Sequence, residues 1–163
     1  MKQTVLFLFL TAITLGAYSQ GASKKGASEL PEFKIMQTSG VYLQKKDLPA
    51  NKPLVVIYFS PNCDHCIILM DQLFPRINEF KKASLLFVTF VNPQELIPFE
   101  KKYNTISHPN IFVGSEGLAY TLKNFYRLEK TPFTALYNKQ GKLVASYKKE
   151  TPLNELLTLL KKA

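Results

Sequence analysis

Apolar residues form two continuous runs in the first half of the chain, at residues 54–59 (LVVIYF) and 83–91 (ASLLFVTFV). A strand that is apolar on both faces is typical of the middle of a sheet whose two sides are covered by helices. Between these runs, apolar residues recur at helical spacing from Ile67 to Phe80. Pro75 should kink this helix rather than end it, because the apolar spacing continues past it. The pattern therefore predicts strand, helix and strand in succession.

Weaker strand patterns occur before and after this central part of the chain. The expected strands are residues 33–37, 41–43, 111–113, 133–137 and 143–147. We expect residues 111–113 to be a short edge strand. The last two strands should form a hairpin with a positive φ at Gly141.

Three further helices are predicted from apolar spacing and from their first residues. They span residues 93–103, 118–126 and 153–160. Asn92 should cap the first, which opens on Pro93, and Thr151 with Pro152 should cap the last. The order of elements predicts an α/β fold.

Length and composition are those of one ordinary globular domain. The chain has 163 residues, of which 46% are hydrophobic and 20% charged, which excludes a disordered or repetitive protein. The net charge is +9, but the lysines are spread along the chain as isolated pairs such as Lys81-Lys82. This spacing favours a solvated basic surface, with weak attraction to an anionic membrane or acidic partner, and we expect no nucleic-acid partner.

The N-terminus has the pattern of an export signal. Lys2 precedes an apolar run at residues 5–17, which is shorter than the roughly 17 or more residues that cross a bilayer. Ala17 and Ser19 fit the cleavage site of signal peptidase. We therefore predict a signal peptide at residues 1–19, a flexible linker at 20–31 and a folded domain at 32–163. An uncleaved membrane anchor is the alternative.

Processing at this site can be tested directly. The exported protein should begin at Gln20, since the small residues Ala17 and Ser19 bracket Tyr18. Intact-mass measurement of the exported form checks this, and a mass that retains residues 1–19 would identify the segment as an anchor.

The two cysteines of the chain stand three positions apart, in Cys63-Asp64-His65-Cys66. Cys63 falls at the start of the predicted helix, where free N–H groups and the helix dipole stabilise a thiolate, so it is the expected nucleophile. Cys66 lies one turn further and is the expected resolving thiol. A purely structural disulfide is the alternative, but a ring over four residues removes little chain entropy.

A metal site is the other chemistry that these residue types suggest. The thiolate and imidazole ligands of the chain are Cys63, Cys66, His65 and His108. His65 lies inside the Cys-x-x-Cys loop and is badly placed to close on the same ion, and His108 has the setting of a loop residue. We expect no metal and no cofactor.

Several of these features together resemble the thioredoxin superfamily. They are the buried strand that runs into Cys63-Asp64-His65-Cys66, the Thr131-Pro132 pair and the hairpin that follows. The segments at residues 130–134 and 138–143 are most similar to exported TlpA-like thiol-disulfide reductases. The resemblance implies a thioredoxin-like three-layer fold, with a central mixed β-sheet flanked by helices. It also implies a strand and a helix inserted at residues 109–126, before a cis-proline.

The resemblance further implies roles around the cysteines. Pro132 would be the cis-proline, and the backbone of Thr131 would pair with an extended substrate. Asp64 and His65 support the site, with opposite effects on a thiolate. Thioredoxin has a buried carboxylate six residues before its first cysteine, where this chain has Ile57, so a built-in base for Cys66 is in question.

The function implied is an exported thiol-disulfide oxidoreductase, periplasmic or secreted. We expect a monomeric reductase that acts on exported proteins with cysteine pairs and receives electrons from a membrane donor. A disulfide oxidase or isomerase of the same fold, or a non-catalytic module that binds a partner or metal, is the alternative.

Overall fold

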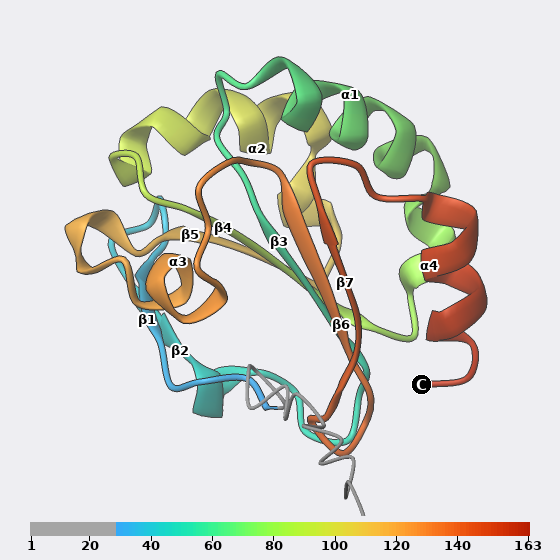
Figure 1. Cartoon of the computed structure of the whole chain (residues 1–163). Coiled ribbons are helices and arrows are strands. Elements are labelled where there is room, and N and C mark those ends of the chain that lie inside the picture. Colours follow the sequence, from blue (N-terminus) through green and yellow to red (C-terminus); the bar gives the residue numbers. More distant parts are fainter. Residues whose placement is uncertain (1–28) are drawn as a thin grey trace, which may run out of the picture.

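One mixed β-sheet of seven strands, in the order β2-β1-β5-β4-β3-β6-β7, forms the centre of the molecule (Figure 1). The computed structural model describes residues 29–163, so the predicted signal peptide and the linker up to residue 28 lie outside it. The strands are β1 (Lys34–Met36), β2 (Tyr42–Gln44), β3 (Leu54–Tyr58), β4 (Ser84–Thr89), β5 (Ile111–Ser115), β6 (Phe133–Tyr137) and β7 (Leu143–Lys148). The α-helices are α1 (Asp64–Leu73), α2 (Ile97–Tyr103), α3 (Thr121–Tyr126) and α4 (Leu153–Leu160).

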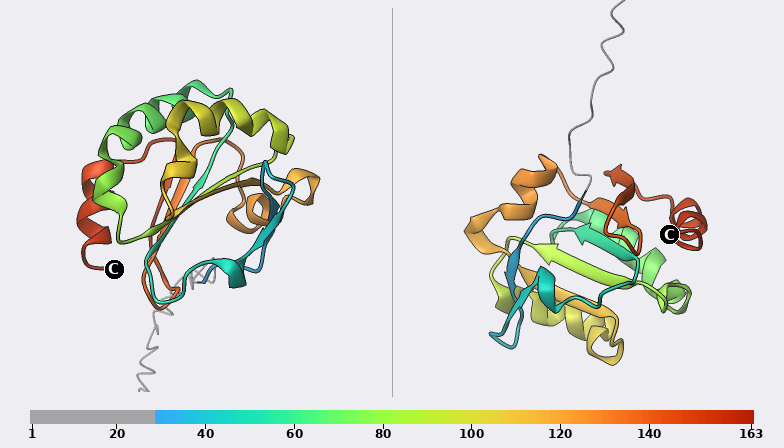
Figure 2. Two further views of the ribbon diagram at one scale, coloured as in Figure 1. Left: turned by 180° about the vertical axis from the view of Figure 1, so that it is seen from behind. Right: turned by 90° about the horizontal axis from the view of Figure 1, so that it is seen from below.

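The two strands with continuous apolar sequence lie at the centre of this sheet. β3 pairs with β4 in parallel and with β6 antiparallel. Alternate side chains of β3 enter opposite cores: Val55 and Ile57 pack with α1, α2 and α4, whereas Val56 and Tyr58 pack with α3. The views in Figure 2 show these helices on the two sides of the sheet. The predicted three-layer fold with a central mixed sheet is confirmed.

The prediction of an edge strand at residues 111–113 is wrong. β5 pairs in parallel with β4 and is covered on its outer side by β1, through Met36 and Ser115. Close approach of β1 depends on Gly114, because a Cβ there would lie 2.8 Å from Ile35 Cδ1. The short hairpin β1–β2 thus takes the edge position.

Helix α1 ends earlier than its apolar spacing indicated. The α-helical geometry stops at Leu73, and residues Phe74–Phe80 continue as a 3-10 helix. Pro75 has no N–H for the i→i−4 bond, which the tighter helix accommodates. The expected kinked α-helix is therefore wrong in geometry, although Ile77 and Phe80 are buried as the pattern requires.

The two predicted caps have different outcomes. The Asn92 side chain accepts a hydrogen bond from Gln94 N at 3.0 Å and caps the 3-10 helix Pro93–Leu96, as predicted. Pro152, rather than Thr151, is the cap residue of α4, and it makes no side-chain cap bond. Thr151 instead shares a 2.7 Å hydrogen bond with the buried Thr134 hydroxyl, so its predicted capping role is wrong.

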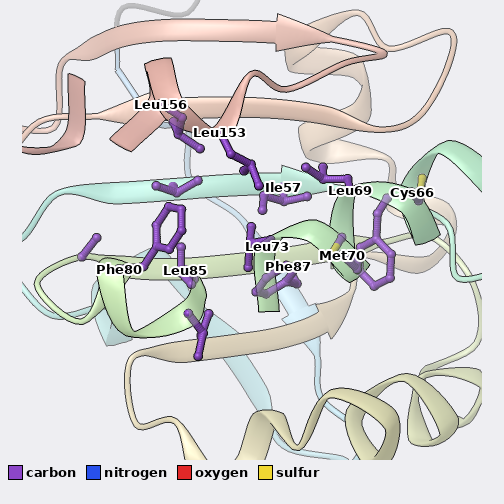
Figure 3. Packing of buried hydrophobic residues seen from close by; sticks show 14 of the residues in the cluster. Ile57, Cys66, Leu69, Met70, Leu73, Phe80, Leu85, Phe87, Leu153 and Leu156 are labelled. Carbon is purple, nitrogen blue, oxygen red and sulfur yellow. The ribbon is translucent and has the colours of Figure 1, made fainter. Parts of the chain in front are cut away.

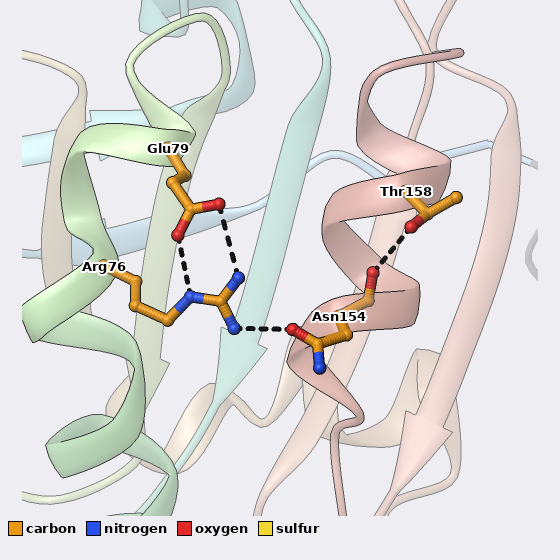
Figure 4. Close-up of polar contacts among 4 residues, drawn as sticks. All are labelled: Arg76, Glu79, Asn154 and Thr158. Atoms are coloured by element: carbon orange, nitrogen blue, oxygen red, sulfur yellow. Dashed lines mark hydrogen bonds and ion pairs between the residues drawn. The ribbon is translucent and has the colours of Figure 1, made fainter.

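The core between the sheet and α1, α2 and α4 reaches the cysteine motif. Ile57, Leu69, Leu73, Phe87 and Cys66 belong to one buried cluster (Figure 3). Its outer side is closed by polar contacts between the 3-10 helix and α4 (Figure 4). Arg76 donates to Glu79 at 2.7 Å and to Asn154 Oδ1 at 2.8 Å. The second of these bonds joins the 3-10 helix to α4 at the surface.

The described chain begins inside the predicted linker. Leu30 is 6% exposed and belongs to the α3-side core. Glu29 forms a β-bridge with Lys142 in the β6–β7 turn, whose Gly141 has φ 72° as expected. Among residues 29–163, no helix is long and apolar enough to cross a membrane.

Candidate redox site

Cys63 and Cys66 lie where β3 gives way to α1, as predicted. Cys63 is the cap residue of α1, with φ −99° and ψ 118°, and its carbonyl accepts the first helical bond from Ile67 N at 3.0 Å. Cys63 is half-buried and Cys66 is 1% exposed. Both are free thiols in this structure.

The Thr131-Pro132 segment faces the cysteines from the start of β6. The peptide bond between these residues is cis, as the resemblance implied. The Cys63 thiol donates to the Thr131 carbonyl at 3.6 Å, and Lys149 N donates to the Pro132 carbonyl at 2.9 Å. The structure thus brings Cys63 and Thr131 together, although they are far apart in the sequence.

The environments of the two thiols shift their pKa values in opposite directions. Burial raises the pKa of Cys63, but hydrogen bonds from the Thr131 side chain, the Cys66 thiol and the backbone N–H groups of Cys66 and His65 more than offset this, and the net pKa is lowered. Burial raises the pKa of Cys66 to about 12, with partial compensation from the Ser60 backbone. The arrangement matches an accessible nucleophile and a shielded resolving thiol.

The asymmetry predicts the order of alkylation. At neutral pH a thiol with a pKa of about 12 is ionised in about one molecule in 10⁵, whereas the lowered pKa of Cys63 keeps a far larger thiolate fraction. Iodoacetamide should therefore modify Cys63 at least about a hundredfold faster than Cys66. Quenched time points analysed by peptide mass spectrometry give both rates, and equal rates would remove the assignment of roles.

The other polar residues of the motif face solvent. Asp64 and His65 are exposed in the first turn of α1. A carboxylate at this position opposes a thiolate at the same helix end, because two negative charges close together repel each other. His108 precedes β5 at the opposite end of the sheet from Cys63. Within residues 29–163, no three Cys, His, Asp or Glu side chains gather as metal ligands.

A cavity beside Cys66 was not predicted. It has a volume of about 220 Å³ and lies between the β3–α1 connection, α1 and α2. Its floor includes Cys66 and Phe99, and its rim includes Glu95 and Lys102. Ile57 is fully buried in the same cluster as Cys66, so an apolar side chain packs where thioredoxin has its carboxylate. Local sequence patterns carry no signal for this cavity, because it forms only when α2 folds back over α1.

A helix-initiating dithiol that faces a cis-proline across the end of a mixed sheet defines the thioredoxin class of proteins. A family model for the thioredoxin-like domain matches residues 44–163. The chain therefore belongs to the thioredoxin-like domain family, and the predicted superfamily is confirmed.

Solved structures show the same fold at low sequence identity. The secreted Mycobacterium tuberculosis disulfide oxidoreductase homologous to E. coli DsbE aligns with a TM-score of 0.66 and 16% identity, over 80% of this chain and 96% of that one. The exposed lipoprotein thioredoxin Etrx1 of Streptococcus pneumoniae gives 0.62 and 20%, over 82% and 100%. Arabidopsis thaliana ScoI with copper bound gives 0.65 and 16%, over 83% and 98%. A comparison with curated proteins found no match.

Proposed function

We propose that the protein is an exported thiol-disulfide oxidoreductase that reduces disulfides in other exported proteins. The observation that carries this proposal is the asymmetry of the dithiol: Cys63 is accessible with a lowered pKa, and Cys66 is buried with a raised one. A structural disulfide has no need for such asymmetry. Export is supported by the N-terminal signal pattern and by the secreted and exposed proteins that share the fold.

The reaction follows from the positions of the two sulfurs. The Cys63 thiolate attacks one sulfur of the substrate disulfide, whose S–S bond breaks, and the first substrate cysteine leaves as a thiolate. Cys66 then gives its proton to that thiolate and attacks Cys63 Sγ, which releases the second substrate cysteine. Two electrons pass to the substrate, and the protein is left with a Cys63–Cys66 disulfide. A dithiol donor at the membrane returns it to the reduced form.

Thr131 and Pro132 supply the binding surface for this reaction. An extended substrate segment pairs with the backbone of Thr131, next to Cys63. Pro132 has no N–H of its own and so leaves Thr131 as the pairing residue. Asp64 and His65, exposed in the first turn of α1, tune the charge next to the Cys63 thiolate.

Metal carriage is less well supported by the donor set. The ScoI structure with copper bound shows that the fold can hold this metal. In the described part of this chain, however, Cys63 and Cys66 have no third Cys, His, Asp or Glu gathered with them. Two thiols without such a neighbour suit redox exchange better than tight metal retention.

The insulin assay tests the proposed activity. Micromolar protein should accelerate the reduction of insulin disulfides by dithiothreitol, measured as the onset of B-chain precipitation. A rate equal to that of dithiothreitol alone would leave a non-catalytic thioredoxin-fold module as the function.

The proposed role as a reductase predicts the reduction potential of the Cys63–Cys66 disulfide. A strong oxidant requires a strongly stabilised thiolate, and the Asp64 carboxylate opposes this at the helix start. The potential should therefore lie nearer to the thioredoxin value of about −270 mV than to the DsbA value of about −120 mV. Equilibration with glutathione and dithiothreitol couples, followed by acid quenching and alkylation, gives the potential. A value close to that of DsbA would favour an oxidase or isomerase.

A further inference from the structure

A shallow basic depression lies beside the cis-proline. It has a volume of about 200 Å³ and joins the loop before Pro132 to the end of β7. Its lining includes Leu128, one carboxylate, Glu129, and four cationic residues. We call these four residues the basic cradle; they are Arg127, Lys130, Lys148 and Lys149. All four are exposed, and none forms an ion pair with a carboxylate of residues 29–163.

The cradle is connected to the redox site through the backbone. Lys149 N donates to the Pro132 carbonyl at 2.9 Å, and the carbonyl of the preceding Thr131 accepts from the Cys63 thiol at 3.6 Å. Lys149 also lines a second groove of about 440 Å³ with His65 and Ile68 of α1. A substrate segment that pairs with the backbone of Thr131 would therefore lie between α1 and the cradle.

The backbone is in the left-handed conformation at two of the four cationic residues. Arg127 and Lys149 have positive φ values of 52° and 72°. Each is held by a hydrogen bond, Arg127 N to Asn124 O at 3.1 Å and Lys149 N to Pro132 O. The cradle lies on the segments that flank Pro132, so its cations stand next to the backbone that receives the substrate, where they can select a partner by charge complementarity.

We infer that the preferred substrates are polypeptides with acidic residues close to the disulfide. This inference rests on the proposed function and adds a substrate class to it. A residue in an extended segment advances by about 3.3 Å, so side chains a few positions from the substrate cysteine reach the cradle. Exposed charge pairs are weak one by one, and four unpaired cations act mainly by raising the rate of productive encounter.

Matched peptides test the inference. Three peptides, each with one internal disulfide, should be identical except at two positions within five residues of a cysteine. Both positions are Asp in the first peptide, Asn in the second and Lys in the third. With wild-type protein at low salt, kcat/KM for the Asp peptide should exceed that for the Lys peptide about tenfold, and the ratio should shrink in 0.5 M salt. A second set with the charges on the other side of the cysteine identifies the direction of binding.

Two charge-reversed variants separate the cradle from the overall charge. Lys130→Glu with Lys148→Glu should remove or invert the preference for the Asp peptide. Lys52→Glu with Lys139→Glu changes the net charge equally at the opposite end of the sheet, and it should keep the preference. Thermal unfolding verifies that both variants are folded.

The outcomes distinguish the inference from the function beneath it. If wild type reduces the Asn peptide but shows no preference between Asp and Lys, or if both variants lose the preference equally, the inference is wrong and the proposed function stands. If wild type reduces none of the peptides, the proposed function fails and the inference fails with it.

Discussion

Replacing Cys63 by serine should abolish disulfide reduction. A serine hydroxyl is not ionised at neutral pH and cannot form the mixed disulfide, so no part of the exchange can begin. The protein-dependent part of the rate in the insulin assay should fall at least about a thousandfold, or about 4 kcal/mol of transition-state stabilisation, which leaves the rate of dithiothreitol alone. The Cys63 side chain makes no helix-cap bond, so serine should be tolerated by the fold. Urea unfolding of the variant verifies this.

The matched variant Cys66→Ser should behave differently. It retains the nucleophile but lacks the thiol that releases the substrate, so a mixed disulfide on Cys63 should accumulate. Mass spectrometry of exported proteins captured on this variant would identify substrates and the attacking sulfur in one experiment. Capture on Cys63→Ser instead would reverse the assigned roles.

The central part of the fold was predictable because its sequence pattern and its environment agree. Residues of β3 and β4 are apolar on both faces since they pack against a core on each side. The location of β5 was not predictable in the same way. Its interior place depends on Gly114 and on the β1–β2 hairpin, which pairs with it across a long stretch of sequence.

The candidate site likewise has a part that could be predicted from the sequence and a part that could not. Cys63 and Cys66 could be found because they form a short motif at the start of a predicted helix, whereas the Thr131-Pro132 pair was indicated only by the resemblance to the thioredoxin superfamily. The cavity beside Cys66 and the basic cradle could not be found, because each is assembled from segments that meet only in the folded chain. Helix-capping predictions succeeded at Asn92 and failed at Thr151, whose hydroxyl has a tertiary partner.

Glu116 is a buried charged residue, within residues 29–163, that no sequence pattern indicated. It is 6% exposed, yet its carboxylate accepts three hydrogen bonds from two segments. Tyr58 OH and Leu122 N donate at 2.7 Å, and Lys123 N donates at 3.1 Å. Burial and this contact raise the pKa of Tyr58, which stays protonated and able to donate. The carboxylate thereby ties the start of α3 to β3, the strand that leads into the cysteine motif.

Removing this carboxylate should produce a large loss of stability. In Glu116→Ala, the Tyr58 hydroxyl and two backbone N–H groups lose their acceptor inside the protein, and each unpaired buried group costs about 1–3 kcal/mol. We expect the free energy of unfolding to fall by about 3–5 kcal/mol, the low end of the sum over three groups because the Lys123 N–H is only partly buried, out of the roughly 5–15 kcal/mol that such a domain has. Urea unfolding of the reduced protein measures the difference.

Two further variants make this result specific to the buried contact. Glu116→Gln keeps one acceptor oxygen and should lose about half as much stability as the alanine variant. Glu32→Ala removes a carboxylate that is 81% exposed and pairs with Lys45 at the surface, and it should change stability by less than about 1 kcal/mol. If Glu116→Ala lay within the same small range, water would have to satisfy all three donors, and the carboxylate would not hold α3 to β3.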